Sequence, residues 1–204
     1  MAIDAKIVME LRNRTGAGIV DAKKALEETG GDMEKAIDVL KKKGAIKAAK
    51  KSAERTASEG LLATYLHHNG KLAAIIELAC ETDFVARNEE FKQLANDLAL
   101  QVAAMDPQYV SPETIPAADV DKKRNEFLAE LASDNKPEDI KQKIVEGKLN
   151  KWYSETCLMK QSFIKDEEKR VEDLINALVG KIGEKIVPTR FMRMQMAGPM
   201  SQSC

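Results

Sequence analysis

The chain has 204 residues, of which 32 are Lys or Arg and 33 are Asp or Glu, so its formal net charge at pH 7 is −1. This length suits one or two compact domains, and the balanced charge excludes a global field that would attract nucleic acid or a membrane surface. The three cysteines are widely separated and odd in number, which argues against a disulfide framework or a zinc site.

Residues 1–6 lack the apolar stretch of a signal peptide, and no apolar run in the chain reaches membrane-spanning length. We therefore expect a soluble, cytoplasmic protein that does not contact a membrane. Aromatic residues make up only 4% of the chain, whereas Ala, Leu, Lys and Glu are abundant. This composition is typical of a mostly helical protein.

Residues 5–44 are expected to form three short helices, because apolar side chains recur at helical spacing between turns that contain glycine. Asp32 should cap the third helix and Gly44 should end it. A three-helix bundle of about 40 residues is near the lower limit of independent stability and is similar to the ubiquitin-associated domain. It has no catalytic side chains, so we interpret residues 1–44 as a docking module.

Seven basic residues and one acidic residue, Glu54, lie between Lys41 and Arg55. On a helix, Lys43, Lys47 and Arg55 would share a face with Lys50 or Lys51. This face suits either RNA or an acidic partner, or it is the solvated side of a linker helix. We favour a linker helix over residues 45–59, because no aromatic or glycine-rich element accompanies the charges. An RNA-associated protein is the alternative.

Residues 60–67 and 71–79 are expected to form a β-hairpin around Asn69-Gly70, a pair typical of a type I′ turn in which both residues have positive φ. His67 and His68 are the only histidines. Adjacent residues of a strand face opposite sides of a sheet, so we expect these two histidines not to bind one metal ion. We also expect the protein to have no cofactor.

The segment that follows the hairpin carries Asp83 and Phe84 side by side, between an apolar strand and a helix that Asn88 should cap. Either Asp83 caps a helical turn and Phe84 lies in the core, or both are exposed and enter a partner protein. The pattern alone favours the first interpretation, since Phe is usually a core residue. No neighbouring group could complete an acid–base pair with Asp83, so we expect no enzymatic activity.

Helices are expected over residues 88–105, 119–132, 137–157 and 171–182, with a loop at 161–166. Met192, Met194 and Met196 then alternate with polar residues, which is typical of a strand. Pro188 cannot donate a ladder hydrogen bond, so we expect an edge strand that pairs with the hairpin. These residues complete an α+β core over 60–197, and residues 198–204 are expected to be a flexible tail.

Residues 82–88 resemble the signature motif of the translation elongation factor Ts family. Other segments resemble the same family in the same order, namely residues 11–18, 21–26, 44–51, 109–113 and 163–166. The resemblance implies a ubiquitin-associated-like module followed by a core of helices packed on a three-stranded antiparallel sheet. It also implies guanine nucleotide exchange on elongation factor Tu, without covalent chemistry or direct binding to nucleic acid.

In this family the motif matched by Thr82, Asp83, Phe84 and Val85 enters the GDP-bound partner beside its nucleotide site and helps to displace Mg²⁺. The resemblance further implies that the N-terminal module docks on the partner's nucleotide domain, with Arg12, Ile19 and Val20 at matching positions.

Two features depart from the family pattern. The methionine-rich last strand is less β-branched and aromatic than the family pattern, and the chain leaves no room for the second core half or the accessory helical hairpin of longer members. A homodimer would supply a missing surface by symmetry.

Overall fold

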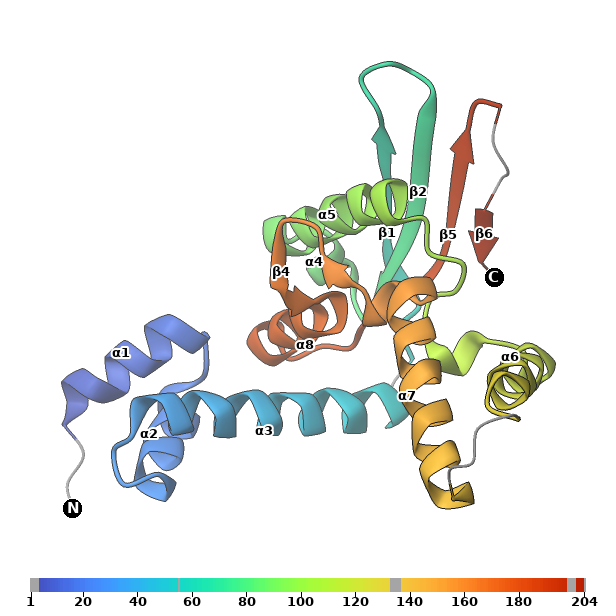
Figure 1. Ribbon diagram of the computed structural model, residues 1–204. Helices are drawn as coiled ribbons and strands as arrows, with labels where there is room; N and C mark the ends of the chain where they lie inside the picture. Colours follow the sequence, from blue (N-terminus) through green and yellow to red (C-terminus); the bar gives the residue numbers. More distant parts are fainter. Residues whose placement is uncertain (1–3, 55, 133–136, 198–200, 204) are drawn as a thin grey trace. The chain divides into compact units, whose positions relative to one another are not determined.

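The computed structural model describes residues 4–54, 56–132, 137–197 and 201–203 (Figure 1). Two compact units make up the chain: Met1–Leu61 with Leu78–Leu94 and Asp173–Val187, and Leu62–Glu77 with Ala95–Glu172 and Pro188–Cys204. The elements in chain order are α1 (Ala5–Thr15), α2 (Ile19–Glu28), α3 (Met33–Glu54), β1 (Glu59–Leu66), β2 (Leu72–Cys80), α4 (Asp83–Ala86), α5 (Glu89–Met105), η1 (Pro112–Thr114), α6 (Ala117–Glu130), α7 (Glu138–Thr156), η2 (Leu158–Lys160), β3 (Ser162–Phe163), β4 (Asp166–Arg170), α8 (Val171–Ile182), β5 (Ile186–Gln195) and β6 (Ser201–Ser203).

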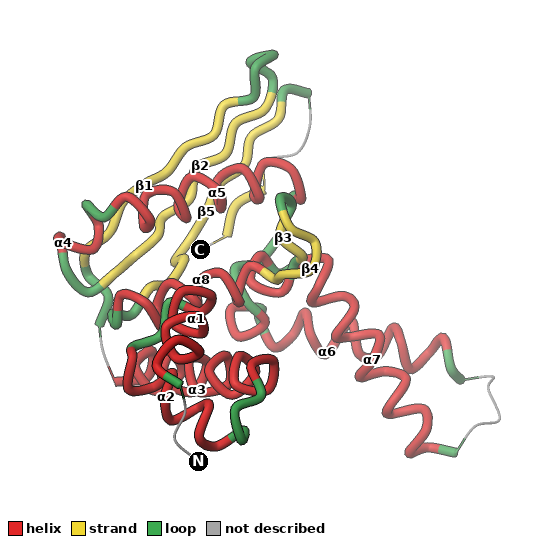
Figure 2. The backbone as a smooth tube through the Cα atoms, turned by 90° about the vertical axis from the view of Figure 1, so that its left-hand side faces the viewer, coloured by secondary structure: helices red, strands yellow, loops and turns green. Residues whose placement is uncertain are grey.

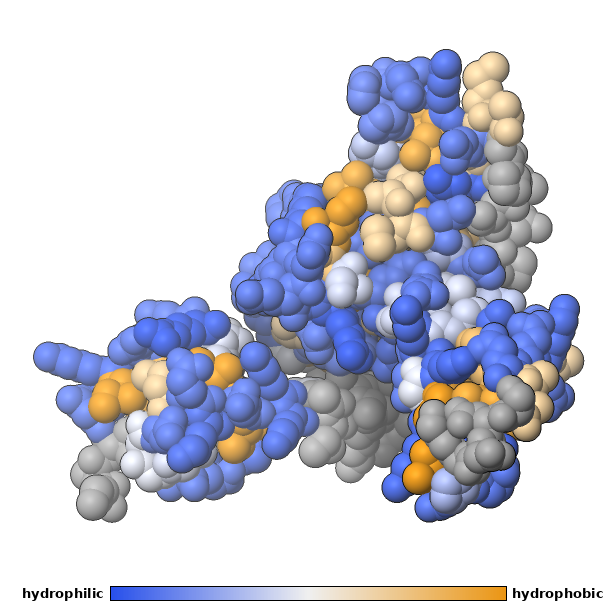
Figure 3. Space-filling model, in the orientation of Figure 1, coloured by the Kyte–Doolittle hydropathy of each residue, from blue (hydrophilic) through white to orange (hydrophobic). Residues whose placement is uncertain are grey.

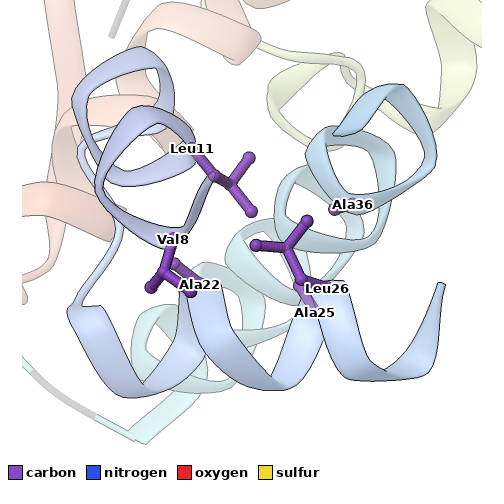
Figure 4. Packing of buried hydrophobic residues seen from close by; sticks show 6 residues of the cluster. All are labelled: Val8, Leu11, Ala22, Ala25, Leu26 and Ala36. Carbon is purple, nitrogen blue, oxygen red and sulfur yellow. The ribbon is translucent and has the colours of Figure 1, made fainter. Parts of the chain in front are cut away.

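The first three helices form a bundle around a small apolar core, as the helical spacing predicted. Asp4 caps α1 by accepting a hydrogen bond from the Lys6 amide, and Gly16 ends it in the left-handed conformation. The core consists mostly of small side chains from all three helices (Figure 4): Val8, Leu11, Ala22, Ala25, Leu26 and Ala36. Small residues allow the three helices to approach one another closely.

Gly44 does not end the third helix, so that prediction was wrong. Helix α3 runs without interruption from Met33 to Glu54. A glycine inside a helix costs only about 1 kcal/mol relative to alanine, and the Ala and Lys residues that follow are strong helix formers. The predicted linker helix therefore continues the bundle's third helix, while the predicted domain boundary at residues 44 and 45 stays a prediction.

The expected three-stranded antiparallel sheet is present as β1, β2 and β5, and β6 adds a fourth strand in the order β1-β2-β5-β6 (Figure 2). Residues 201–203, expected to lie in a flexible tail, pair antiparallel with residues 191–193 of β5. Strand β5 is therefore an inner strand there, rather than the edge strand predicted from Pro188. Pro188 is compatible with this position because it precedes the part of β5 that pairs with β6.

The β1–β2 hairpin is present, but its turn differs from the predicted type. Among the described residues of the turn, Gly70 has positive φ and Asn69 does not. Gly70 N–H donates to the His67 carbonyl at 2.8 Å, and the Asn69 side chain accepts from Lys71 N–H at 2.9 Å. Because β1 ends at Leu66, His68 lies in the turn. Its ring lies 4.2 Å from that of His67 between centroids, so the two rings do not face opposite sides of a strand.

One face of the sheet packs on α5, and Arg193 of β5 forms a hydrogen bond between the two. This side chain is buried and its Nε donates to the Ala103 carbonyl of α5 at 3.0 Å. The neighbouring β5 residues Met192 and Met194 point to the other face, where they are exposed. Apolar residues recur along α5 at helical spacing, and all of them are buried except Met105 at its end, which is 45% exposed: Phe91, Leu94, Ala95, Leu98, Val102 and Met105.

Helices α6 and α7, both expected from the sequence, pack together as a helical hairpin (Figure 2). Its own small core is made by Leu131, Val145 and Leu149. Trp152 and Tyr153 are partly buried and pack against this core. In place of the loop expected at 161–166, β3 and β4 form a two-stranded sheet. Across the described residues, no helix is long and apolar enough to cross a membrane.

Candidate functional site

The predicted motif begins where β2 ends and continues as the single helical turn α4 (Figure 2). Thr82 is the N-cap residue of α4, with extended backbone angles (φ −130°, ψ 155°). Asn88 then caps α5 as predicted, since its side chain accepts a hydrogen bond from Glu90 N–H at 2.8 Å. A strand and a long helix therefore flank the motif closely on both sides.

Thr82 is held from the rear by Glu184, which lies in the loop between α8 and β5. The Thr82 amide donates to Glu184 Oε2 at 3.1 Å, and the Thr82 hydroxyl donates to Glu184 Oε1 at 2.9 Å. In the opposite direction, Glu81 Oε1 accepts a hydrogen bond from Lys185 N–H at 2.6 Å. Two carboxylates thus join the start of the motif to a loop that is distant in sequence.

Phe84 is the most exposed large apolar residue of the described chain, with 81% of its surface accessible. The interpretation that its ring lies in the core is therefore wrong. Asp83 is partly exposed and forms an ion pair with Arg87 one helical turn later, at 2.9 Å. Val85, by contrast, is buried. Of the four predicted residues, Phe84 and Asp83 face solvent, whereas Thr82 and Val85 face the protein.

The chemistry around the motif offers no nucleophile. Burial, with a further contribution from the Glu184 carboxylate, raises the pKa of Cys80 to about 11, so this thiol is protonated at neutral pH. The two histidines lie at the tip of the β1–β2 hairpin rather than beside Asp83. Among the described residues, no three His, Cys, Asp or Glu side chains gather closely enough to hold a metal ion.

The second group of predicted residues lies on the N-terminal helices. Ile19 and Val20 open α2 and are 52% and 65% exposed, and Arg12 is exposed near the end of α1. Figure 3 shows apolar side chains at the surface of this bundle. Met9 of α1 is also exposed, at 43%, and was not predicted as a surface residue. The predicted basic face lies outside the described side chains, since these do not include Lys47, Lys50, Lys51 and Arg55.

Glu184 was missed from the sequence because it lies 102 residues from Thr82. Its local sequence, between Gly183 and Lys185 at the end of a helix, is that of an ordinary surface loop. Only the pairing of β5 with the hairpin brings this loop beside the motif, and no periodicity signals such a contact.

Comparison with known proteins gives a consistent result over nearly the whole chain. The protein family described as Elongation factor TS matches residues 20–178. A protein named elongation factor Ts from Thermosipho melanesiensis is 52% identical over 191 residues, which cover 94% of this chain and 97% of that protein. The elongation factor Ts of Thermotoga petrophila is 51% identical over 196 residues, covering 96% and 97% respectively. That of Desulforamulus reducens is 49% identical over 194 residues, covering 95% and 89%.

Proposed function

The chain belongs to the elongation factor Ts family, and from this premise we propose that it is a guanine nucleotide exchange factor for elongation factor Tu. Membership of the family makes it a factor of translation elongation, within protein biosynthesis. The exposed ring of Phe84 on α4 is the observation that best supports the exchange step. In this role the protein works in the cytoplasm, on the GDP-bound form of its partner.

The proposed mechanism uses binding energy rather than covalent chemistry. A nucleotide held through Mg²⁺ and a phosphate-binding loop leaves slowly, because these contacts must break together. A protein that binds only the loosened conformation of the partner makes that conformation more populated. Phe84 supplies such a preference if its ring enters a site that is open only in the loosened state. Burying a phenylalanine side chain contributes about 1.5–3 kcal/mol.

Asp83 contributes its negative charge to the proposed contact, and burying that charge in the partner has a cost in free energy. Its carboxylate is paired with Arg87 in the free protein. Entering a partner removes the carboxylate from water, which is unfavourable unless a donor replaces the solvent. We infer that a hydrogen-bond donor or a helix N-terminus of the partner takes that place. Thr82 and Val85 support the motif from behind.

The N-terminal bundle supplies the second contact. Ile19 and Val20 are exposed at the start of α2, and Arg12 is exposed near the end of α1. Such a combination suits docking on a surface that offers apolar side chains and a carboxylate. Because binding of this protein and of nucleotide are linked, each must weaken the other by the same factor. The factor is therefore displaced when fresh nucleotide binds, and it acts catalytically.

The exchange step is tested by replacing the ring. We expect Phe84→Ala to slow the release of fluorescent GDP from loaded elongation factor Tu by about 10- to 100-fold relative to the unaltered factor, since 1.4 kcal/mol corresponds to tenfold. Ile140→Ala on α7 is a matched control, because this residue is also apolar and exposed. Unchanged release with the Phe84 variant would rule out the ring as the wedge.

We further propose that two copies associate through the outer face of the sheet. The exposed apolar residues of this face come from three strands: Leu62, Leu66, Ile75, Met192 and Met194. Arg190 and Glu77 form an ion pair on the same face at 2.8 Å, so the face carries both charges. A surface with matched charges and flexible methionines complements itself under a two-fold axis. The methionine-rich strand would then serve as an interface.

The association is tested by the mass in solution. We expect a particle of twice 22.6 kDa at micromolar concentration in light scattering, and a monomer for Met194→Lys. Met105→Lys, on an exposed part of α5, should leave the mass unchanged. A monomer of the unaltered chain with full exchange activity would exclude the dimer.

A further inference from the structure

We propose that Glu184 is a positioning residue that fixes the orientation of Phe84 by binding Thr82. The inference rests on the proposed exchange function, because a ring that acts as a wedge must be presented at a defined angle. It assigns to Thr82 and Glu184 a role that differs from contact with the partner.

The polar groups of Thr82 are all engaged within this protein. Its amide and its hydroxyl both donate to the carboxylate of Glu184, at 3.1 and 2.9 Å. Its carbonyl accepts from the Cys80 thiol at 3.1 Å and from Ala86 N–H at 3.3 Å. Both donors of Thr82 and its carbonyl are therefore occupied within this protein, which leaves only the hydroxyl oxygen able to accept a further bond, and the residue is held at several points.

The hydroxyl of Thr82 is used in an unusual way for an N-cap residue. A threonine at this position normally accepts a hydrogen bond from an amide in the first turn of its helix. Here no side-chain capping bond forms, and the hydroxyl instead donates to Glu184. Helix α4 has only four residues, too few to be stable alone. Its direction therefore depends on the residues that hold its ends, and Thr82, two positions before Phe84, holds its start.

Glu184 is itself well placed to act as an anchor. Gly183 ends α8 in the left-handed conformation, with φ 87°, and its amide donates to the Val179 carbonyl at 2.8 Å. Lys185 N–H, on the other side of Glu184, donates to Glu81 Oε1. The motif and the loop after α8 are thus joined twice: Glu81 of the motif side binds the loop, and Glu184 of the loop binds the motif. Charge-assisted bonds of this kind are stronger than neutral ones.

The first test measures the motif in the free protein. We expect Glu184→Ala to accelerate amide hydrogen exchange over residues 82–88 by about tenfold or more, because bonds to charged groups are lost. Glu184→Gln keeps one acceptor and should show a smaller effect. Glu167→Ala removes an exposed carboxylate of β4 and is the matched control. Equal exchange in Glu184→Ala and in the control would overturn the inference.

The second test measures GDP release from loaded elongation factor Tu. We expect Glu184→Ala to lower the maximal stimulated rate by about tenfold, with partial recovery in Glu184→Gln. In the Phe84→Ala background the same substitution should add little further loss, since the two residues act in series. Independent, multiplying losses would show that Glu184 acts apart from Phe84 and would overturn the inference.

Substitutions at Thr82 keep the inference falsifiable if Glu184→Ala does not fold. Thr82→Val removes the hydroxyl at nearly constant shape, and Thr82→Ser retains it. We expect the valine variant to reproduce the loss of stimulated release and the serine variant to restore it; equal rates in the two would contradict the positioning role. If the unaltered factor does not stimulate GDP release at all, the proposed function itself fails. Failure of the positioning role alone leaves that stimulation intact.

Discussion

Gly60, at the start of β1, lies too close to β2 to accept a side chain without a shift of the backbone. Its φ is +150°, and a Cβ built on it would lie 2.2 Å from the Leu78 carbonyl oxygen and 2.8 Å from Ala79 Cα of β2. Ordinary contacts begin at 3.4 Å, so the backbones of β1 and β2 would have to separate by more than about 1 Å. We therefore expect Gly60→Ala to destabilise the protein.

The magnitude follows from two separate costs. Overpacking a close contact costs about 1–3 kcal/mol, and a sparsely allowed φ adds a further 1–3 kcal/mol or so. A loss on the order of 3 kcal/mol lowers the thermal midpoint of a chain this size by roughly 6–12 °C. Because Leu78 and Ala79 come just before Cys80, we also expect faster hydrogen exchange in the motif that follows.

The measurement is thermal unfolding followed by circular dichroism. Gly147→Ala in α7 is the control, since no atom lies within 4 Å of its Cβ position and its φ is not positive. That substitution should raise stability by about 0.5–1 kcal/mol, because it replaces glycine inside a helix. If Gly60→Ala unfolds at the same temperature as the unaltered chain, the close approach of β1 and β2 is wrong.

Three other predictions concern single groups. Arg193→Met should cost about 1–3 kcal/mol in urea unfolding, because it removes the donor to the Ala103 carbonyl while keeping the aliphatic volume; a change below 0.5 kcal/mol or so would contradict this. Arg87→Ala should change stability by less than about 1 kcal/mol, since its pair with Asp83 is exposed, and chemical denaturation can measure this. Burial raises the pKa of both Cys80 and Cys157 to about 11, so folding favours the protonated thiols. The stability that these thiols contribute to the folded protein is complete below the pKa of an unfolded thiol and is lost as pH rises toward 11. Alkylation at pH 8 should therefore be slow at both residues until the chain unfolds, and rapid labelling of the native protein would refute their burial.

Much of the fold could be predicted from periodicity. The apolar stripe of α5, the two strands of the hairpin and the alternating residues of β5 each carry a signal within their own segment. Three features carry no such signal. A glycine often ends a helix, but the helix-forming residues around Gly44 continue α3 through it. Strand β6 contains only Ser and Gln, which do not favour a strand. The small β3–β4 sheet consists largely of charged residues.

The candidate site divides in the same way. Asp83 and Phe84 stand out as an acid beside an aromatic ring, but hydropathy assigns a phenylalanine to the core. Its exposure follows from the direction of α4, which Thr82 sets through Glu184. That contact joins residues 102 positions apart, so it becomes visible only once the chain is folded.

The guanidinium of Arg193 has a consequence for how the molecule is made. It donates to the Ala103 carbonyl near the end of α5, yet it lies on β5, 90 residues later in the chain. Until β5 emerges, β2 can pair only with β1, and the apolar face of α5 lacks the side chains that β5 contributes. This part of the core therefore cannot close on a nascent chain before β5 is made, and a chain that stops ahead of β5 would expose apolar surface and tend to aggregate.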